Sequence, residues 1–138
     1  MHGKDQARDR GRDCLARAVS VTETLRAAAE RIEAARELPP DVVEALHAAR
    51  LFRLLLPRSL DGDELDPLHL AQVTEVIAAV DASTAWCLGQ AAGCAMSAAF
   101  LEPRVAHRIF GPRDAVLAEL AARARRASPT PILGVVRA

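Results

Sequence analysis

The chain has 138 residues, about the length of one ordinary domain, and 51% of them are apolar. Its 18 basic and 18 acidic side chains give a formal net charge of zero, which excludes the single-sign field expected of a partner for nucleic acid or an anionic membrane. Aromatic residues are scarce, with one Trp, three Phe and no Tyr, whereas Ala and Leu are abundant. Because Ala and Leu lose little entropy in helices, the composition predicts an all-α fold, a bundle of five to six helices.

The first part of the chain predicts two helices after a polar segment. Residues 1–13 are polar and contain no apolar stretch like that of a secretory signal, so we expect a disordered N-terminus. From Cys14 to Arg36, apolar residues recur at steps of three and four, which predicts one long amphipathic helix. Pro40 opens a second helix that runs to about Arg50. The predicted apolar face of the long helix comprises Leu15, Val19, Thr22, Leu25, Ala29, Ile32 and Ala35.

A turn-rich connector follows, in which Pro57 stops any regular element. Asp66-Pro67 combines an N-cap residue with a proline at the first helical position, which predicts a third helix reaching Val80. Four acidic residues gather in the connector, but their spacing is not that of a calcium-binding EF-hand loop. We interpret them as a solvated acidic turn. They are Asp61, Asp63, Glu64 and Asp66.

The stretch 85–99 is the most unusual part of the chain. Nearly every position in it is Ala, Gly, Cys, Ser, Met or Leu, next to the only tryptophan. A helix that is apolar all round is buried, and this one is too weakly apolar to span a bilayer, so we expect it to be buried in protein. Asp81 or Ser83 caps its start, and Gly89 and Gly93 allow a second backbone or a flat ligand to come close. A fifth helix is predicted from Glu102-Pro103 to Gly111-Pro112.

Residues of the catalytic and metal-binding types show no functional pattern. Cys87 and Cys94 are seven positions apart on one helix, about 10 Å along its axis, which is too far for a disulfide. Three cysteines without metal-ligand spacing indicate a reduced, cytoplasmic chain. We expect His47 and His69 at the surface, and neither they nor His107 has a partner at catalytic spacing. The sequence therefore predicts no catalytic residue and no metal site.

Three segments, taken in order, carry a family resemblance. The segment ELPPDVVEALHAARLFRLLLPRSLDGDELDP matches a pattern of LP, a helix, GLF-x-L-x-xP and GG-x-E-x-DP. HLAQVTEVIAAVDASTAWCLGQAAG matches a helix with A-x-x-D-x-S-x-x-W, and IFGPRDAVLA matches the turn into a central sheet. Over residues 14–118 the chain therefore resembles the N-terminal helical domain of the acyl-CoA dehydrogenase superfamily. It is most similar to the branch of flavin-dependent monooxygenases that act on aromatic or heteroaromatic substrates.

The resemblance implies a flavin, FAD or FMN, held between a central β-domain and a C-terminal helical bundle. It implies a small-molecule substrate, an acyl thioester or an aromatic ring, with the N-terminal domain as one wall of its pocket. Trp86, Gln90 and Cys94 step by four and share one side of their helix, so the resemblance makes them candidates for that wall. The residues themselves leave an alternative open, because Trp and Cys are usually buried for packing. Gln90 is the stronger candidate, since a buried amide needs a partner and a ligand can be one.

The chain departs from the family pattern in two places. The family usually has Gly at the positions of Arg50 and Asp61, so we expect a relaxed or strained left-handed turn near Arg50. Residues 119–138 lack strand alternation and family motifs, and we interpret them as a divergent tail of a truncated product, read out of the ancestral frame. We expect such a chain to be inactive alone, and to self-associate through its uncovered helix or dock onto the missing domains. Two alternatives are a separately encoded subunit that docks onto a partner chain and an unrelated helical interaction module.

Overall fold

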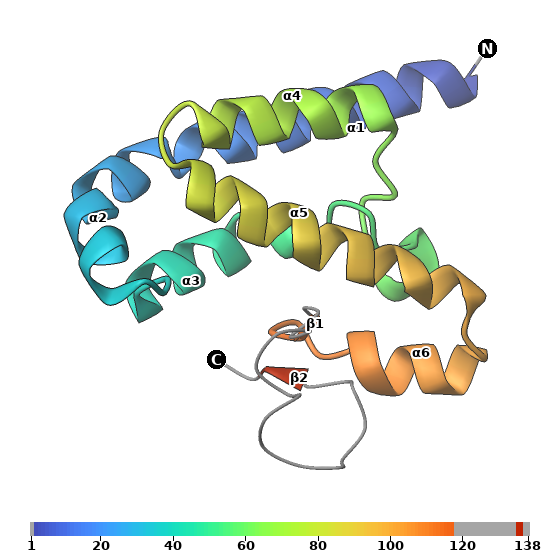
Figure 1. The fold of residues 1–138 in the computed structure, drawn as a ribbon. Helices are drawn as coiled ribbons and strands as arrows, with labels where there is room; N and C mark the ends of the chain where they lie inside the picture. The colour runs from blue at the N-terminus through green and yellow to red at the C-terminus, as the bar shows by residue number, and fades with distance from the viewer. Residues whose placement is uncertain (1, 118–134, 137–138) are drawn as a thin grey trace.

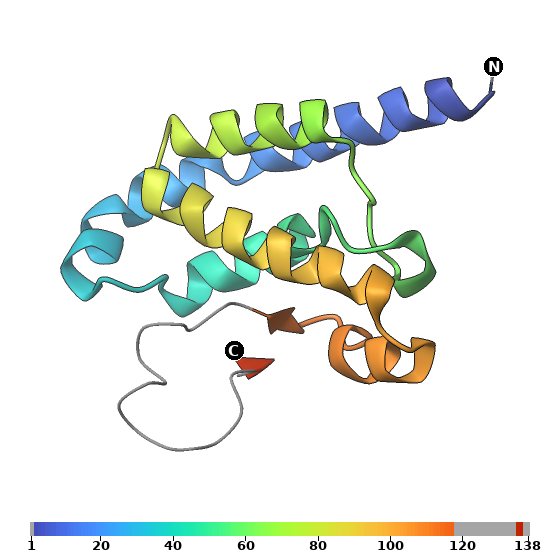
Figure 2. The ribbon, with the colours of Figure 1, turned by 45° about the vertical axis from the view of Figure 1, so that its right-hand side comes forward.

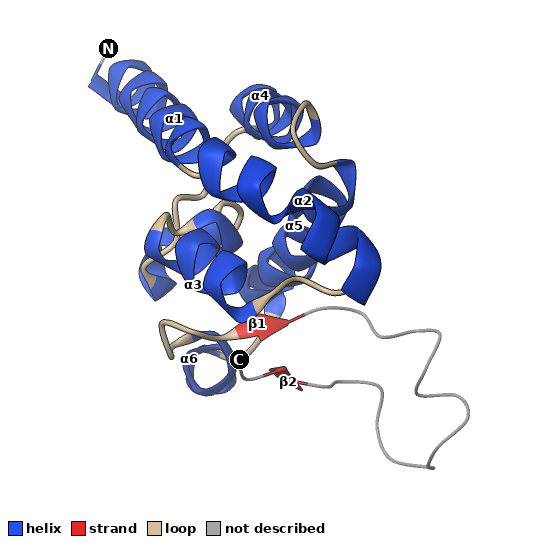
Figure 3. Cartoon of the chain, turned by 90° about the vertical axis from the view of Figure 1, so that its left-hand side faces the viewer, coloured by secondary structure: helices blue, strands red, loops and turns tan. Residues whose placement is uncertain are grey.

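The computed structural model describes residues 2–117 and 135–136, and within them the chain is mostly helical, as predicted (Figure 1). Helices α1 and α4 lie side by side, and α5 crosses the middle of the domain next to α4. Helices α2 and α3 close one end, while α6 lies near the far end of α5 (Figures 2 and 3). The helices are α1 (His2–Ser20), α2 (Thr22–Ala35), α3 (Pro40–Ala48), α4 (Pro67–Ala78), α5 (Ala82–Met96) and α6 (Pro103–Phe110), with 3-10 turns η1 (Leu51–Arg53), η2 (Arg58–Leu60) and η3 (Ser97–Phe100).

The N-terminal segment corrects one prediction. Residues 2–13 belong to helix α1, where the sequence pattern predicted disorder over residues 1–13. The physical reason is a narrow seam of small buried residues, Gly11, Cys14 and Ala18, along which α1 packs against α4. A Cβ atom at Gly11 would overlap the ring of His69 on α4, so only glycine permits this close approach.

The predicted long helix from Cys14 to Arg36 is two helices. The chain bends at Val21, which separates α1 from α2. The bend changes which side faces the core, so the predicted apolar face is wrong in part: Val19 is 56% exposed and Ala35 is exposed. The buried residues of this segment are Cys14, Ala18, Val21, Leu25, Ala28 and Ile32.

The predicted starts of the last three helices, α4, α5 and α6, are confirmed. Asp66, Asp81 and Glu102 each accept hydrogen bonds at 2.6–3.2 Å from backbone amides two or three residues further on. Ser83 does not cap α5 itself, and its hydroxyl instead donates to the Asp81 carboxylate at 2.7 Å. These caps fix where α4, α5 and α6 begin.

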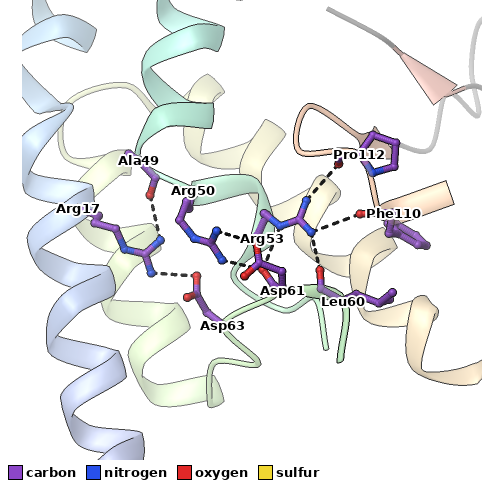
Figure 4. A network of polar contacts seen from close by, with 9 residues as sticks. All are labelled: Arg17, Ala49, Arg50, Arg53, Leu60, Asp61, Asp63, Phe110 and Pro112. Atoms are coloured by element: carbon purple, nitrogen blue, oxygen red, sulfur yellow. Dashed lines mark hydrogen bonds and ion pairs between the residues drawn. The ribbon is translucent and has the colours of Figure 1, made fainter. Parts of the chain in front are cut away.

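The connector between α3 and α4 holds three left-handed residues that are not glycine, of which Glu64 has φ 46°. Arg50 has φ 59° and Asp61 has φ 61°, which confirms the left-handed turn expected at Arg50. The two residues are also bonded to each other (Figure 4). Arg50 donates through Nη1 to Asp61 Oδ2 at 3.0 Å and through Nη2 to the Asp61 carbonyl at 2.6 Å. The strained backbone at one position is thus tied to the strained backbone at the other.

A short strand pair follows α6. Strand β1 (Val116–Leu117) pairs antiparallel with β2 (Val135–Val136), with Val116 opposite Val136. The expected tail without strand character is therefore wrong at residues 135–136, where two adjacent β-branched residues pair with β1. The rest of the predicted tail, 119–134 and 137–138, lies outside the described residues.

Candidate functional site

Helix α5 has one buried face and one open face. The buried face packs into the core against α4, η1 and β1. On the other side Trp86 is 70% exposed, Met96 51% and the following Phe100 86%. The prediction that this helix is buried all round is therefore wrong for half of its surface, because among the described residues no element covers that side. The open face consists of Trp86, Gly89, Gln90, Gly93, Cys94, Met96, Ser97 and Phe100.

The three predicted site residues lie on this open face. Trp86 is largely exposed, so it is not a core residue among the described residues. Gln90 and Cys94 are half-buried at the edge of the face. Gly89 and Gly93 lie beside them, and a Cβ at either position would have nothing within 4 Å. The result is a shallow apolar surface that a flat molecule or another helix can approach closely.

A cavity of about 540 Å³ adjoins the start of the open face. It lies between the end of α2 and the first turns of α5, where Cys87 is the neighbour of Trp86. Burial opposes ionisation of Asp81, but hydrogen bonds from Ser83 and Thr84 outweigh it and hold the Asp81 pKa below its usual value. Partial burial, and then the Asp81 charge, raise the pKa of the Cys87 thiol, so this cysteine is not an activated nucleophile. The lining residues are Ala29, Ile32, Glu33, Arg36, Glu37, Leu38, Asp81, Ala82, Ser83 and Cys87.

The acidic connector is ion-paired, and its interpretation as a solvated turn is wrong at Asp63 alone, since the side chains of Asp61, Glu64 and Asp66 are 41–64% exposed. Asp63 accepts from Arg17 of α1 at 2.9 Å, and both side chains are less than a fifth exposed. Arg17 also donates to the Ala49 carbonyl at 3.0 Å, so it joins α1, the end of α3 and the connector (Figure 4). Sequence reasoning missed Arg17, because its partner Asp63 lies 46 positions further along the chain. Asp61 pairs with Arg50, Glu64 pairs with Arg58, and Asp66 caps α4.

Arg53 is the most buried charged residue that the structure describes, at 5% exposure. Its guanidinium donates to the carbonyls of Leu60 at 2.5 Å, Asp61 at 3.1 Å, and Phe110 and Pro112 both at 3.3 Å (Figure 4). Burial lowers its pKa. Sequence reasoning missed this residue, although an arginine inside the apolar run LFRLLL is the signal that could have found it. Arg53 fixes the connector against the end of α6 and so positions the segment that leads into β1.

Comparison with known families decides what kind of domain this is. The family model described as "Acyl-CoA dehydrogenase, N-terminal domain" matches residues 12–102. The chain belongs to this family. A search of curated proteins finds no match. The matched range of this acyl-CoA dehydrogenase N-terminal domain contains the whole of α5 and the connector with its three left-handed residues. The match confirms the resemblance to this N-terminal domain.

Two histidines of this acyl-CoA dehydrogenase N-terminal domain, His47 and His69, pack against neighbouring residues. His47 is half-buried, and the centroid of its ring lies 4.7 Å from the centroid of the Phe52 ring. Burial lowers the pKa of His47. His69 is also half-buried, and its Nδ1 lies 2.5 Å from an Asp66 carboxylate oxygen. The expected surface positions of these two histidines are therefore wrong, because packing against Phe52 and Gly11 covers them.

No group of three or more His, Cys, Asp or Glu side chains among the described residues is arranged to hold a metal ion. The three cysteines are free, and Cys14 is buried, with its pKa raised to about 11 by burial and then by the Asp63 charge. None of the helices that the structure describes combines the length and the apolar character needed to cross a bilayer.

Proposed function

We propose that this N-terminal domain forms one wall of the substrate pocket of a flavin-dependent oxidoreductase, and that the open face of α5 is that wall. One observation carries the proposal: α5 buries one side in the core and leaves an apolar, aromatic side uncovered. Exposed apolar patches of this kind mark surfaces that another domain or a ligand covers. In the family, the flavin-binding domain and the C-terminal bundle are the covering parts.

Each predicted site residue has a physical role in such a wall. Trp86 offers a flat apolar surface against an acyl chain or an aromatic ring. Gln90 can donate to or accept from a substrate carbonyl, since its half-buried amide makes no hydrogen bond within the described residues. Cys94 supplies a small, polarisable surface one turn further on. The flavin, FAD or FMN, supplies the electron chemistry when bound, and this chain contributes position and polarity.

Two substrate classes fit this proposal. The family match favours an acyl thioester, as the family name states. The A-x-x-D-x-S-x-x-W resemblance, which ends at Trp86, favours an aromatic ring and a monooxygenase reaction. A wall built from tryptophan and glycine accepts a flat ring or an extended chain, so ligand binding has to separate the two classes.

The test is assembly with the missing parts. The 138-residue chain is co-expressed with the flavin-binding and C-terminal domains of an acyl-CoA dehydrogenase-family enzyme that lacks its own N-terminal domain. We expect a complex that retains flavin, with alkylation of Cys94, mapped by mass spectrometry, slowed at least tenfold relative to the free chain at nanomolar concentration, where the chain is monomeric. An acyl-CoA or an aromatic compound should slow it further, and whichever ligand does so identifies the substrate class.

Two variants sharpen this test. Gln90→Leu is expected to permit assembly but to weaken protection of Cys94 by the ligand, because it removes the polar contact and keeps the apolar surface. Ala27→Glu, at an exposed position of α2, serves as a control with no expected effect. A complex in which Cys94 remains as reactive as in the free chain would contradict the proposed wall.

A further inference from the structure

The open face of α5 is symmetric about Gly93. Trp86 lies seven residues before Gly93 and Phe100 seven residues after it. Gly89 and Ser97 lie four residues away on either side. The last turn, η3, is a 3-10 helix in which residues three apart eclipse, so Phe100 stays on the same side as Ser97. A two-fold rotation about an axis at Gly93 therefore generates an antiparallel copy of the helix in which each aromatic residue faces an aromatic residue and each small residue faces a small residue.

From this symmetry we propose that α5 pairs antiparallel with α5 of a second copy of the chain, about a two-fold axis at Gly93. Trp86 of each copy then packs against Phe100 of the other, about 10 Å from the axis. The interface is isologous, so the same surface serves both copies and the assembly closes as a dimer. Gly89 and Gly93 have open space where a Cβ would be, which allows the two backbones to come close at the centre.

Charge at the two ends of α5 favours the antiparallel arrangement. The first turns of α5 adjoin the cavity, whose lining has three carboxylates, those of Glu33, Glu37 and Asp81, against the single cation Arg36, so this end is acidic on balance. The other end leads into α6, which folds back beside it (Figure 1) and carries the exposed Arg104 and Arg108 against the exposed N-cap Glu102, so this end is basic on balance. An antiparallel pair brings the acidic end of one copy to the basic end of the other, whereas a parallel pair places like charges together.

The area of the open face indicates how tightly the two copies bind each other. A Trp or Phe side chain buries about 150–250 Å² when fully covered, so Trp86 and Phe100 together offer about 300 Å² per copy. With Met96 and the small residues, the pair buries on the order of 1,000 Å² in total, which is at the low end of specific interfaces. We therefore expect a dissociation constant in the micromolar range. The proposal goes beyond the proposed function and uses the same face, so one molecule cannot do both at once.

Sedimentation velocity of the 138-residue chain tests the pairing. The expected result is a monomer–dimer equilibrium, with the Gly93→Glu variant shifted at least tenfold toward monomer because two like charges meet at the axis. Glutamate is a better helix former than glycine and meets no atom there, so this variant is expected to melt no lower than the unaltered chain. Ala27→Glu on α2 introduces the same charge away from the face and should leave the dimer intact.

Disulfide trapping tests the register. In a chain with Cys87 and Cys94 replaced by serine, Gly93→Cys should form an intermolecular disulfide under mild oxidation. Gly89→Cys should not, because two copies of residue 89 lie about 12 Å apart along the axis in the antiparallel pair. Monomer at every concentration, open-ended aggregation, a dimer that persists in Gly93→Glu, or equal trapping at both positions would each overturn the proposal. A monomer that still assembles with the flavin-binding domains would leave the proposed pocket wall standing.

Discussion

Replacing Arg53 with methionine is expected to lower the free energy of unfolding by about 3 kcal/mol. The guanidinium donates to four backbone carbonyls, and its bonds to Leu60 and Phe110 are buried. A buried acceptor left without a donor costs about 1–3 kcal/mol, so two of them cost about 2–6 kcal/mol. Methionine keeps the packing of the apolar stem and removes a buried charge, which offsets part of that loss. The net effect is a large fraction of the roughly 5–15 kcal/mol that stabilises a typical domain.

Urea unfolding followed by circular dichroism measures this effect. The measurement is best made in the Gly93→Glu background, so that unfolding is not coupled to association. Arg58→Met is the matched control, since Arg58 lies in the same connector but forms only an exposed ion pair with Glu64 at 3.0 Å, worth about 0–1 kcal/mol. Arg53→Lys keeps the positive charge but lacks the planar guanidinium with its several donors. Its loss of unfolding free energy is therefore expected to lie between those of Arg53→Met and Arg58→Met. An Arg53→Met variant no less stable than Arg58→Met would refute the role assigned to Arg53.

Three further predictions concern single side chains. Gly11→Ala should destabilise the chain by about 1–2 kcal/mol, because the added Cβ displaces the His69 ring. Gly89→Ala should stabilise it by about 1 kcal/mol, because the added Cβ meets no atom and Ala is the better helix former. Thermal melts in which both variants change stability in the same direction would contradict the packing of α1. Burial lowers the pKa of His47, so the folded state binds the proton less readily than the unfolded state, and stability is lost as the pH falls through about 6.5. Melts of His47→Gln between pH 7.5 and 5.5 should lack that loss. A thiol reagent should modify the two cysteines of α5 in the native chain and Cys14 only after denaturation, as counted by mass spectrometry.

Local signals in the sequence were sufficient to place the helix starts. Asp66, Asp81 and Glu102 cap helices through bonds that span two or three residues, so the sequence near each start contains the whole interaction. The contact between Arg17 and Asp63 joins residues 46 positions apart, and no local pattern reports it. For the same reason the sequence did not reveal the seam between α1 and α4, which depends on a glycine meeting a histidine ring from another helix.

The candidate site was predictable in composition but not in exposure. Spacing by four places Trp86, Gln90 and Cys94 on one side of a helix, and the structure has them there. Whether that side is covered depends on which elements pack against it, and composition does not contain this information. The sequence pattern therefore indicated an apolar helix, whereas the structure shows that only one of its two sides reaches the core.

Because Arg50 is hydrogen-bonded to Asp61, a substitution at one of these positions affects the other. Each residue holds a left-handed backbone that costs a non-glycine residue on the order of 1 kcal/mol, and each also holds the other through two hydrogen bonds. Glycine at position 50 alone removes both hydrogen bonds, and glycine at position 61 alone removes the bond to the carboxylate, so either change relieves strain at one position and weakens the hold on the other. We therefore expect the two positions to change together among relatives, as two glycines or as a charged pair. The connector is compatible with two glycines or with the charged pair, and a glycine at one position with a charged residue at the other should be rarer.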